Sequence, residues 1–188
     1  MYSIELMVEE HENILKLLKV IQNACCGILE GEELLDEDFR KMISFAREYA
    51  DKHHHGKEEQ ILFQQMTEHL GPIGVNLIQH GMLVEHDLGR LHISELEKAL
   101  NQYREEPQTI YKLHALTEAM GYANLLQRHI DKENQAVYSY AEKSLLPDVL
   151  KSVDERVRLF EAKANENHVQ ETHLRALDEL LEKYSAET

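Results

Sequence analysis

The sequence predicts an all-α protein, an up-down-up-down four-helix bundle with an additional C-terminal helix. Helix breakers are scarce, with 8 Gly and 3 Pro among 188 residues, which favours long helices. Apolar residues recur at helical spacings of three and four, as in Ile4, Met7, Val8, Ile14, Leu15, Leu18 and Ile21. No segment shows the sustained alternation of a half-buried strand. Helices joined by short connections are expected to be antiparallel neighbours.

The breakers divide the chain into five predicted helical stretches. The first covers about residues 2–29 and ends at Gly31; the second covers about 36–70. The segment Gly71-Pro72-Ile73-Gly74 predicts a turn before the third stretch, at about 75–103. Pro107 begins the fourth stretch, and Pro147 separates it from the fifth. We therefore expect a bundle over residues 1–146 and a polar C-terminal helical extension over 147–188. This extension would pack across the bundle, pair with another subunit as a homo-oligomer, or stand partly free.

Composition limits the classes of function. The formal net charge of −15 disfavours binding to nucleic acid or to an anionic membrane surface. No apolar run approaches the length that a membrane span needs, and the acidic N-terminus lacks a signal-peptide core. Two cysteines exclude a disulfide framework. We expect a cytoplasmic protein that binds neither nucleic acid nor membrane.

An internal repeat relates the two halves of the predicted bundle, about residues 1–70 and 76–145. A shift of 75 positions superposes MVEEHE at Met7 on MLVEHD at Met82, and HHGKEEQILF at His54 on HIDKENQAVY at His129. The same shift pairs His11 with His86, His54 with His129, and Glu58 with Glu133. His55 and Glu59 have the same spacing as His54 and Glu58, but only the latter pair aligns with the second half.

The repeated residues have the spacing of metal ligands. Residues i and i+4 lie one above the other on a helix, so each His-x-x-x-Glu directs an imidazole and a carboxylate to one point. Two such helices and two single histidines bring four nitrogens and two carboxylates to the bundle axis. Since a carboxylate can bridge two ions, we predict a dinuclear site with these ligands: His11, His54, Glu58, His86, His129 and Glu133.

The donor set favours iron. Imidazole and carboxylate without thiolate suit iron first and manganese second, whereas zinc usually takes four ligands. We therefore expect two non-haem iron ions with an oxo or hydroxo bridge, with manganese or zinc as weaker candidates. The Glu-x-x-His pattern of ferritin-like bundles does not occur in the sequence, nor does a zinc-protease His-Glu-x-x-His motif.

These residues and motifs resemble the hemerythrin-like, or HHE cation-binding, family over about residues 1–146. The resemblance rests on Glu10-His11, HHGKEEQILF, Glu85-His86 and HIDKENQAVY. It implies a four-helix bundle with a non-haem di-iron centre that meets dioxygen, nitric oxide or peroxide. The oxygen carriers of this family have a fifth histidine on the third helix and an aspartate on the fourth. Here Met82 and Arg90 flank His86 at four residues, and Asn134 stands in place of the aspartate. In this respect the ligand set is more similar to the branch associated with iron–sulfur repair and the response to nitric oxide.

Three functional hypotheses follow. The first is a di-iron protein that binds or senses a diatomic ligand, dioxygen or nitric oxide. The alternative is a redox enzyme or iron donor in oxidative or nitrosative stress, which turns over peroxide or nitric oxide or supplies iron for cluster repair. The third is an interaction protein that binds a partner through its acidic C-terminal helix.

The remaining residues of interest have more ordinary interpretations. Eight histidines are expected to be exposed or hydrogen-bonded, with His55 the first choice for a hidden fifth ligand: His53, His55, His69, His80, His92, His114, His168 and His173. Cys25 and Cys26 are interpreted as free thiols. Met7 and Met82 are expected to line the centre as apolar residues, and Tyr122 and Tyr138 to pack in the core. Gly56, Gly89 and Gly121 either allow close helix packing or open a path for a small ligand.

Overall fold

Four antiparallel helical rods form the body of the molecule, and the computed structural model describes residues 1–185 of the chain. The first rod is α1 (Tyr2–Glu30). The second consists of α2 (Asp36–Phe45), the π-helical segments η1 (Ala46–His55) and η2 (Glu58–Leu62), and α3 (Phe63–His69). The third consists of α4 (Gly71–Leu77), η3 (Ile78–Met82) and α5 (Leu83–Glu105). The fourth consists of α6 (Thr109–Lys132), η4 (Glu133–Val137) and α7 (Tyr138–Ser144).

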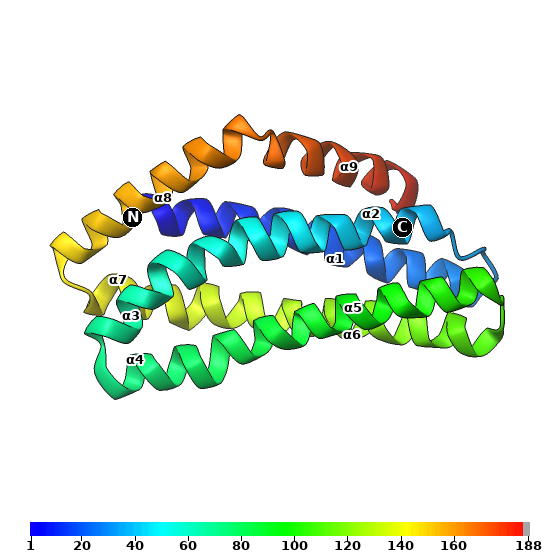
Figure 1. Cartoon of the computed structure of the whole chain (residues 1–188), viewed down its shortest axis with the longest axis horizontal. Coiled ribbons are helices and arrows are strands. Elements are labelled where there is room, and N and C mark those ends of the chain that lie inside the picture. Colours follow the sequence, from blue (N-terminus) through cyan, green and yellow to red (C-terminus); the bar gives the residue numbers. More distant parts are fainter. Residues whose placement is uncertain (186–188) are drawn as a thin grey trace.

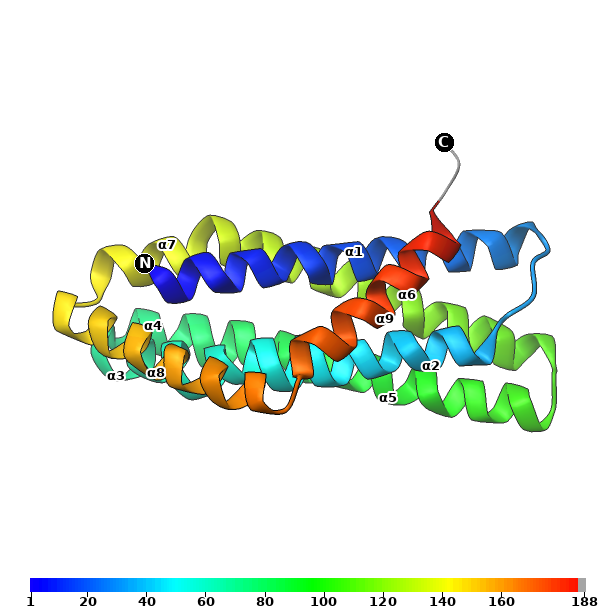
Figure 2. The same cartoon turned by 90° about the horizontal axis from the view of Figure 1, so that it is seen from above.

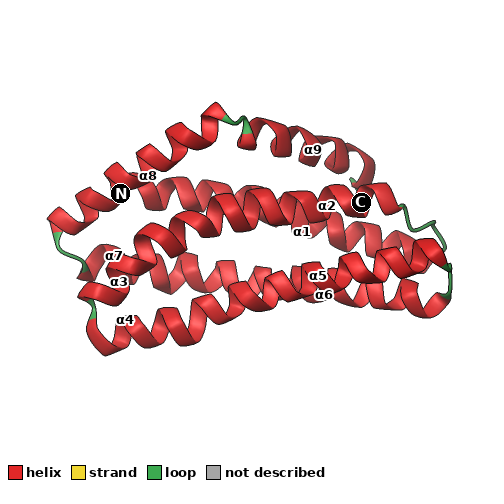
Figure 3. Cartoon of the chain, in the orientation of Figure 1, coloured by secondary structure: helices red, strands yellow, loops and turns green. Residues whose placement is uncertain are grey.

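The connections between the rods alternate between the two ends of the molecule (Figure 1). The described residues contain helices and connecting loops but no strands (Figure 3). This arrangement confirms the predicted all-α, up-down-up-down bundle. The third rod begins at Gly71 and not at about residue 75, so the predicted four-residue turn is shorter than expected. Gly71 adopts a left-handed φ of 60° at this turn, and Pro72 already lies in the first turn of α4.

Two of the π-helical segments begin at predicted ligands. Glu58 is the first residue of η2 and Glu133 the first residue of η4. A π turn bonds each carbonyl to the N–H five residues on, so it contains one residue more than an α turn, and such turns are frequent at functional sites. The internal repeat therefore extends from the sequence to the local backbone geometry.

The C-terminal extension forms two helices, α8 (Pro147–Glu166) and α9 (Val169–Tyr184), where the sequence predicts one. The chain bends at His168, which adopts a left-handed φ of 51°. α8 packs against α1 and η2, and α9 against α1, α2 and η1 (Figure 2). Four apolar side chains anchor these helices to the bundle: Val153, Val157, Leu177 and Leu180. The extension thus packs across the bundle, and its predicted role in a homo-oligomer stays a prediction.

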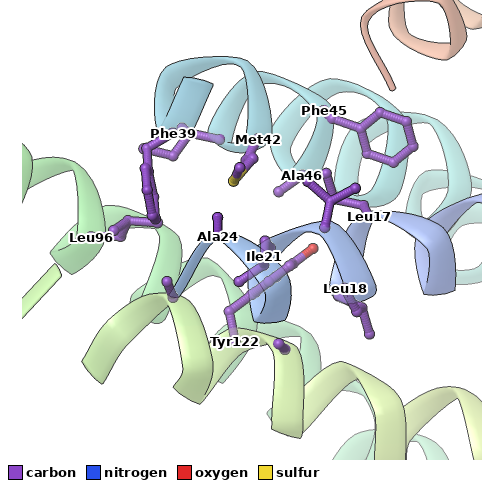
Figure 4. Packing of buried hydrophobic residues seen from close by; sticks show 14 of the residues in the cluster. Leu17, Leu18, Ile21, Ala24, Phe39, Met42, Phe45, Ala46, Leu96 and Tyr122 are labelled. Carbon is purple, nitrogen blue, oxygen red and sulfur yellow. The ribbon is translucent and has the colours of Figure 1, made fainter. Parts of the chain in front are cut away.

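Two apolar clusters fill the interior. The larger one gathers α1 residues such as Leu17 and Ile21 against Phe39 and Met42 of α2 and Leu96 of α5 (Figure 4). The smaller one surrounds Met7, Leu62, Met82 and Tyr138 at the other end. On α1, His11 falls between the last residue of the smaller cluster and the first of the larger. The interior between the two clusters is polar, and the predicted ligands lie there.

None of the described helices combines the length and apolar character that crossing a membrane requires.

Replacing Leu177 by Ala tests whether α9 belongs to the cooperative fold. Leu177 is 1% exposed and packs in the larger cluster, whereas Leu159 on α8 is 72% exposed. Leu177→Ala is expected to lower the free energy of unfolding by about 2–5 kcal/mol. The matched control Leu159→Ala should stay within about 0.5 kcal/mol of the unsubstituted chain. Urea titration followed by circular dichroism measures both; equal losses in the two variants would contradict the packing of α9.

Candidate metal centre

The structure brings all six predicted ligands together in the middle of the bundle and adds His55. One group consists of His11, His54, Glu58 and Glu133, and the other of His55, Glu58, His86 and His129. In each group one donor atom from every residue lies within 4.8 Å of the others. All seven side chains are buried. Glu58 belongs to both groups, so the two clusters are adjacent.

Outer hydrogen bonds fix the orientation of the four repeated histidines. The Nδ1 atom of His11 lies 2.8 Å from Asn134 Oδ1, and that of His54 lies 2.8 Å from Glu10 Oε2. Likewise, His86 Nδ1 lies 2.7 Å from Glu59 Oε1, and His129 Nδ1 lies 2.9 Å from Glu85 Oε2. An oxygen acceptor favours the tautomer with the proton on Nδ1, and in the neutral imidazole Nε2 then keeps a free lone pair toward the centre. Metal-binding histidines in proteins are held in this way.

The residues that accept hydrogen bonds from the histidine Nδ1 atoms are related by the same internal repeat as the predicted ligands. Glu10 and Glu85, which hold His54 and His129, are 75 positions apart, and so are Glu59 and Asn134. Sequence reasoning assigned these four residues no role in the centre, although they stand in the repeated motifs. The shift of 75 was the signal that could have identified them. Asn134 in place of an aspartate still offers His11 an oxygen acceptor.

The two central carboxylates lie between the histidines of both halves. Glu133 places Oε2 3.3 Å from His11 Nε2 and Oε1 3.2 Å from His129 Nε2. Glu58 Oε2 lies 3.8 Å from His54 Nε2 and 3.6 Å from His86 Nε2. Tyr138 donates its hydroxyl hydrogen bond to the other oxygen of Glu58, at 2.6 Å. This is the placement expected of two bridging carboxylates.

Four polar atoms at this point have no hydrogen-bond partner among the described residues. They are His54 Nε2, Glu58 Oε2, and both carboxylate oxygens of Glu133. A buried polar atom without a partner costs about 1–3 kcal/mol. Donors bound about 2.1 Å from one ion lie about 3.0–3.4 Å apart for angles between a right angle and the tetrahedral angle. The Nε2 atoms of His86 and His129 are 3.0 Å apart, within that range. The residues present therefore fit a metal ion.

The titratable groups of the centre shift in opposite directions. Burial and the adjacent Glu133 raise the pKa of Glu58 well above its usual range. Burial and His11 lower the pKa of His54 to about 4. Burial also lowers the pKa of His129, but Glu133 and Glu85 outweigh it and raise the pKa to about 9. Such opposed shifts in one buried cluster are typical of a functional site.

His55 is the fifth histidine of the centre. Its ring is stacked on His86 with centroids 3.8 Å apart, and Asp51 Oδ1 lies 3.4 Å from its Nδ1. Burial and His86 lower the pKa of His55 well below its usual range, which leaves the imidazole neutral. The repeat places Ile130 at the equivalent position, so the repeat alone does not predict this residue. Its position beside His54 made His55 the first choice for a fifth histidine, and the structure places it in the cluster.

A pocket of about 230 Å³ reaches the centre beside this histidine. His55 and His86 line it together with Gly89, Ile93 and Tyr122. A Cβ atom at Gly89 would lie 3.3 Å from Leu126 and 3.7 Å from Tyr122. Gly89 thus keeps space open beside the pocket. Gly121 instead allows close helix packing, because a Cβ there would lie 2.6 Å from the ring of His92.

The remaining histidines and the methionines take ordinary positions. His53 is buried and hydrogen-bonded, and His92 contacts Glu118 at 2.7 Å. His173 is partly buried, and four others are exposed: His69, His80, His114 and His168. Met7 and Met82 are buried in the smaller apolar cluster. Tyr122 packs in the larger cluster, whereas Tyr138 also contacts Glu58.

A family comparison agrees with this geometry. The chain matches the model of the hemerythrin HHE cation-binding domain over residues 2–141. Because this match covers most of the chain, the protein belongs to that family, and its fold and buried His/Glu clusters are those of a cation-binding protein. The comparison with curated proteins and the comparison with solved structures each give no match.

The two cysteines are predicted to differ sharply in reactivity. Both are free; Cys25 is buried and Cys26 exposed. Burial and the adjacent Cys26 raise the pKa of the Cys25 thiol to about 12, and the thiolate is the reactive form. At pH 8 a disulfide reagent should therefore modify one thiol of the native chain rapidly and both after denaturation. Cys26→Ser should abolish the rapid phase and Cys25→Ser should retain it; a rapid phase that survives Cys26→Ser would refute the assignment.

Proposed function

We propose that this protein holds two iron ions in the bundle and binds or senses a diatomic ligand, dioxygen or nitric oxide, at that centre. The observation that carries the proposal is the convergence of partnerless atoms of His54, Glu58 and Glu133 within a cluster of five histidines. Protein interiors rarely leave such atoms unpaired unless a metal or water partner completes them.

The two groups of ligands assign residues to each ion. His11 and His54 would hold the first ion, and His55, His86 and His129 the second. Glu58 and Glu133 would bridge both, since each lies near histidines from both groups. The first ion would have two histidine ligands and the second three, so the two ions would be inequivalent.

The chemical type of the donors favours iron. Five imidazoles and two carboxylates without a thiolate suit iron, and manganese second. A single zinc ion would leave part of this set unused, because zinc usually takes four ligands. Two iron ions held by these residues would supply electrons that dioxygen can accept reversibly.

The surrounding residues define what can reach the centre. The pocket beside His55 and His86 is formed largely by apolar surface, and four charged side chains also line it: Arg47, Asp51, Lys52 and Arg90. Burial keeps the pKa of Tyr122 above its usual range, so its hydroxyl stays neutral. The largely apolar surface of the pocket favours small uncharged molecules such as dioxygen and nitric oxide over hydrated ions.

The optical spectrum of iron-loaded protein tests the proposal. We expect that admitting air to the anaerobically reduced protein produces charge-transfer absorption in the near-ultraviolet and visible, which disappears on deoxygenation. The double variant His54→Ala/Glu58→Ala should lose both the iron and the absorption, because it removes donors to both ions. His114→Ala, which alters an exposed histidine, is the control and should behave like the unsubstituted chain.

Each contrary result has a definite meaning. Absorption that develops irreversibly, or steady consumption of peroxide or nitric oxide with a reductant, would favour the redox-enzyme or iron-donor alternative. Iron binding unaffected by the double substitution would refute the site. Thermal unfolding followed by circular dichroism separates loss of iron from loss of fold.

Filling the pocket should slow ligand binding without removing the metal. Gly89→Val places methyl groups toward Leu126 and Tyr122, so we expect ligand association several-fold slower at unchanged iron content. Gly81→Val is the matched control, because a Cβ at Gly81 meets nothing within 4 Å. Stopped-flow mixing with dioxygen or nitric oxide measures the rates; equal rates in both variants would show that ligands take another path.

A further inference from the structure

A second buried polar cluster lies behind His54, outside the metal ligands. Lys57 is completely buried and its Nζ atom donates to Glu10 Oε1, to Glu161 Oε1 at 2.5 Å, and to His53 Nε2 at 2.9 Å. Glu10 is the acceptor for His54 Nδ1. A continuous chain of contacts therefore runs from Glu161 through Lys57 and Glu10 to a proposed ligand.

Glu161 comes from the C-terminal extension and not from the bundle. It lies on α8, beyond the region that matches the family model, and is 7% exposed. Gln170 of α9 donates to Glu161 Oε2 at 2.7 Å, so both C-terminal helices contribute to the cluster. Phe160 of α8 lies beside it, with Lys57 Nζ 5.7 Å from its ring centroid. The extension thus seals this side of the centre and inserts a carboxylate.

The donors around Lys57 also resemble a metal site, since Glu10, His53 and Glu161 place donor atoms within 4.8 Å of one another. The Lys57 ammonium already contacts all three. With no exposed surface, it has no route to solvent. The cluster is therefore a fixed charge arrangement in which the lysine is the cation.

The internal repeat places an equivalent lysine–glutamate–histidine arrangement in the second half of the bundle, where the C-terminal helices do not cover the lysine. Lys132 is 75 positions after Lys57 and donates to Glu85, which in turn holds His129. The Lys132 side chain is 48% exposed, and no second carboxylate contacts it among the described residues. One ammonium balances one carboxylate there, whereas in the covered half one ammonium faces both Glu10 and Glu161. The covered half therefore keeps one surplus negative charge next to His54.

We propose that Glu161 is a positioning residue for His54, and that the C-terminal helices complete the metal centre by way of Lys57 and Glu10. This inference rests on the proposed metal centre. Because Lys57 is shared with Glu161, it neutralises less of the Glu10 carboxylate, whose Oε2 atom is the acceptor for His54 Nδ1. That bond fixes the ring and increases the basicity of Nε2. Without the Glu161 charge, Glu10 is the only charged carboxylate that Lys57 contacts, the ammonium draws more of its charge, and the bond to His54 weakens.

Glu161→Gln tests the proposal, because it removes the charge and keeps the shape. In protein loaded with ferrous iron, we expect a chelator to extract one of the two ions about tenfold faster, the lower end of the effect of changing a histidine's hydrogen-bond partner. The other ion should leave at its former rate. Glu155→Gln, the same change at an exposed position of α8, is the control and should alter neither rate. Equal acceleration of both ions, or of neither, would overturn the proposal.

A second readout does not need metal. Nuclear magnetic resonance of the metal-free chain detects the Nδ1–H protons of buried histidines. Glu161→Gln should shift the His54 proton and speed its exchange with water, while the corresponding His129 proton stays unchanged as an internal reference. If the chain bound no metal, the proposed function would fail and this measurement would still decide the role of Glu161. An unchanged His54 proton would overturn that role.

A milder variant covers the case in which Glu161→Gln does not fold. Gln170→Ala removes the donor to Glu161 at a partly exposed position. The Glu161 charge stays but loses a contact that holds it against Lys57, so the same His54 signal should change in the same direction by a smaller amount. No change in that signal, in protein whose circular dichroism spectrum is unaltered, would count against the proposal.

Discussion

The structure depends on one constraint: buried imidazoles and carboxylates must be held in the middle of a bundle whose two ends are apolar. Each repeated histidine meets this constraint by bonding Nδ1 to an oxygen acceptor, while Nε2 faces the centre. The atoms that remain partnerless belong to His54, Glu58 and Glu133, the residues placed to receive an ion. The bundle thus has a polar layer in its middle, with an apolar cluster on either side.

The symmetry of this layer is incomplete, and the departures have functional meaning. The repeat explains the paired ligands, the paired acceptors Glu10 and Glu85, and the π-helical segments that begin at Glu58 and Glu133. His55 has no equivalent and gives one half a third histidine. Glu161 has none either, and comes from a helix outside the repeat. These two residues make the two proposed metal positions inequivalent, since one lies beside the pocket and the other beside the buried Lys57 cluster.

The sequence predicted the bundle and the convergence of the six repeated residues because both depend on local periodicity. Helical spacing defines an apolar face, and the i, i+4 spacing places His54 near Glu58 wherever the helix lies. It did not predict the break at His168, since a left-handed residue in a polar stretch leaves no mark on apolar spacing. Nor could it predict that Glu161 reaches Lys57, a contact between residues 104 positions apart that only the packing of α8 creates. His55 has no counterpart in the repeat, so the sequence marked it only as the first choice for a fifth histidine, on the ground of its neighbours.

The number of metal ions per chain tests the central claim most directly. Native mass spectrometry of the protein reloaded with ferrous iron without air would give that number for the folded chain. The convergence of five histidines around two shared carboxylates predicts two ions per chain. Absence of bound ions, or a single ion that persists after His129 and Glu133 are both replaced, would contradict a dinuclear centre at these residues.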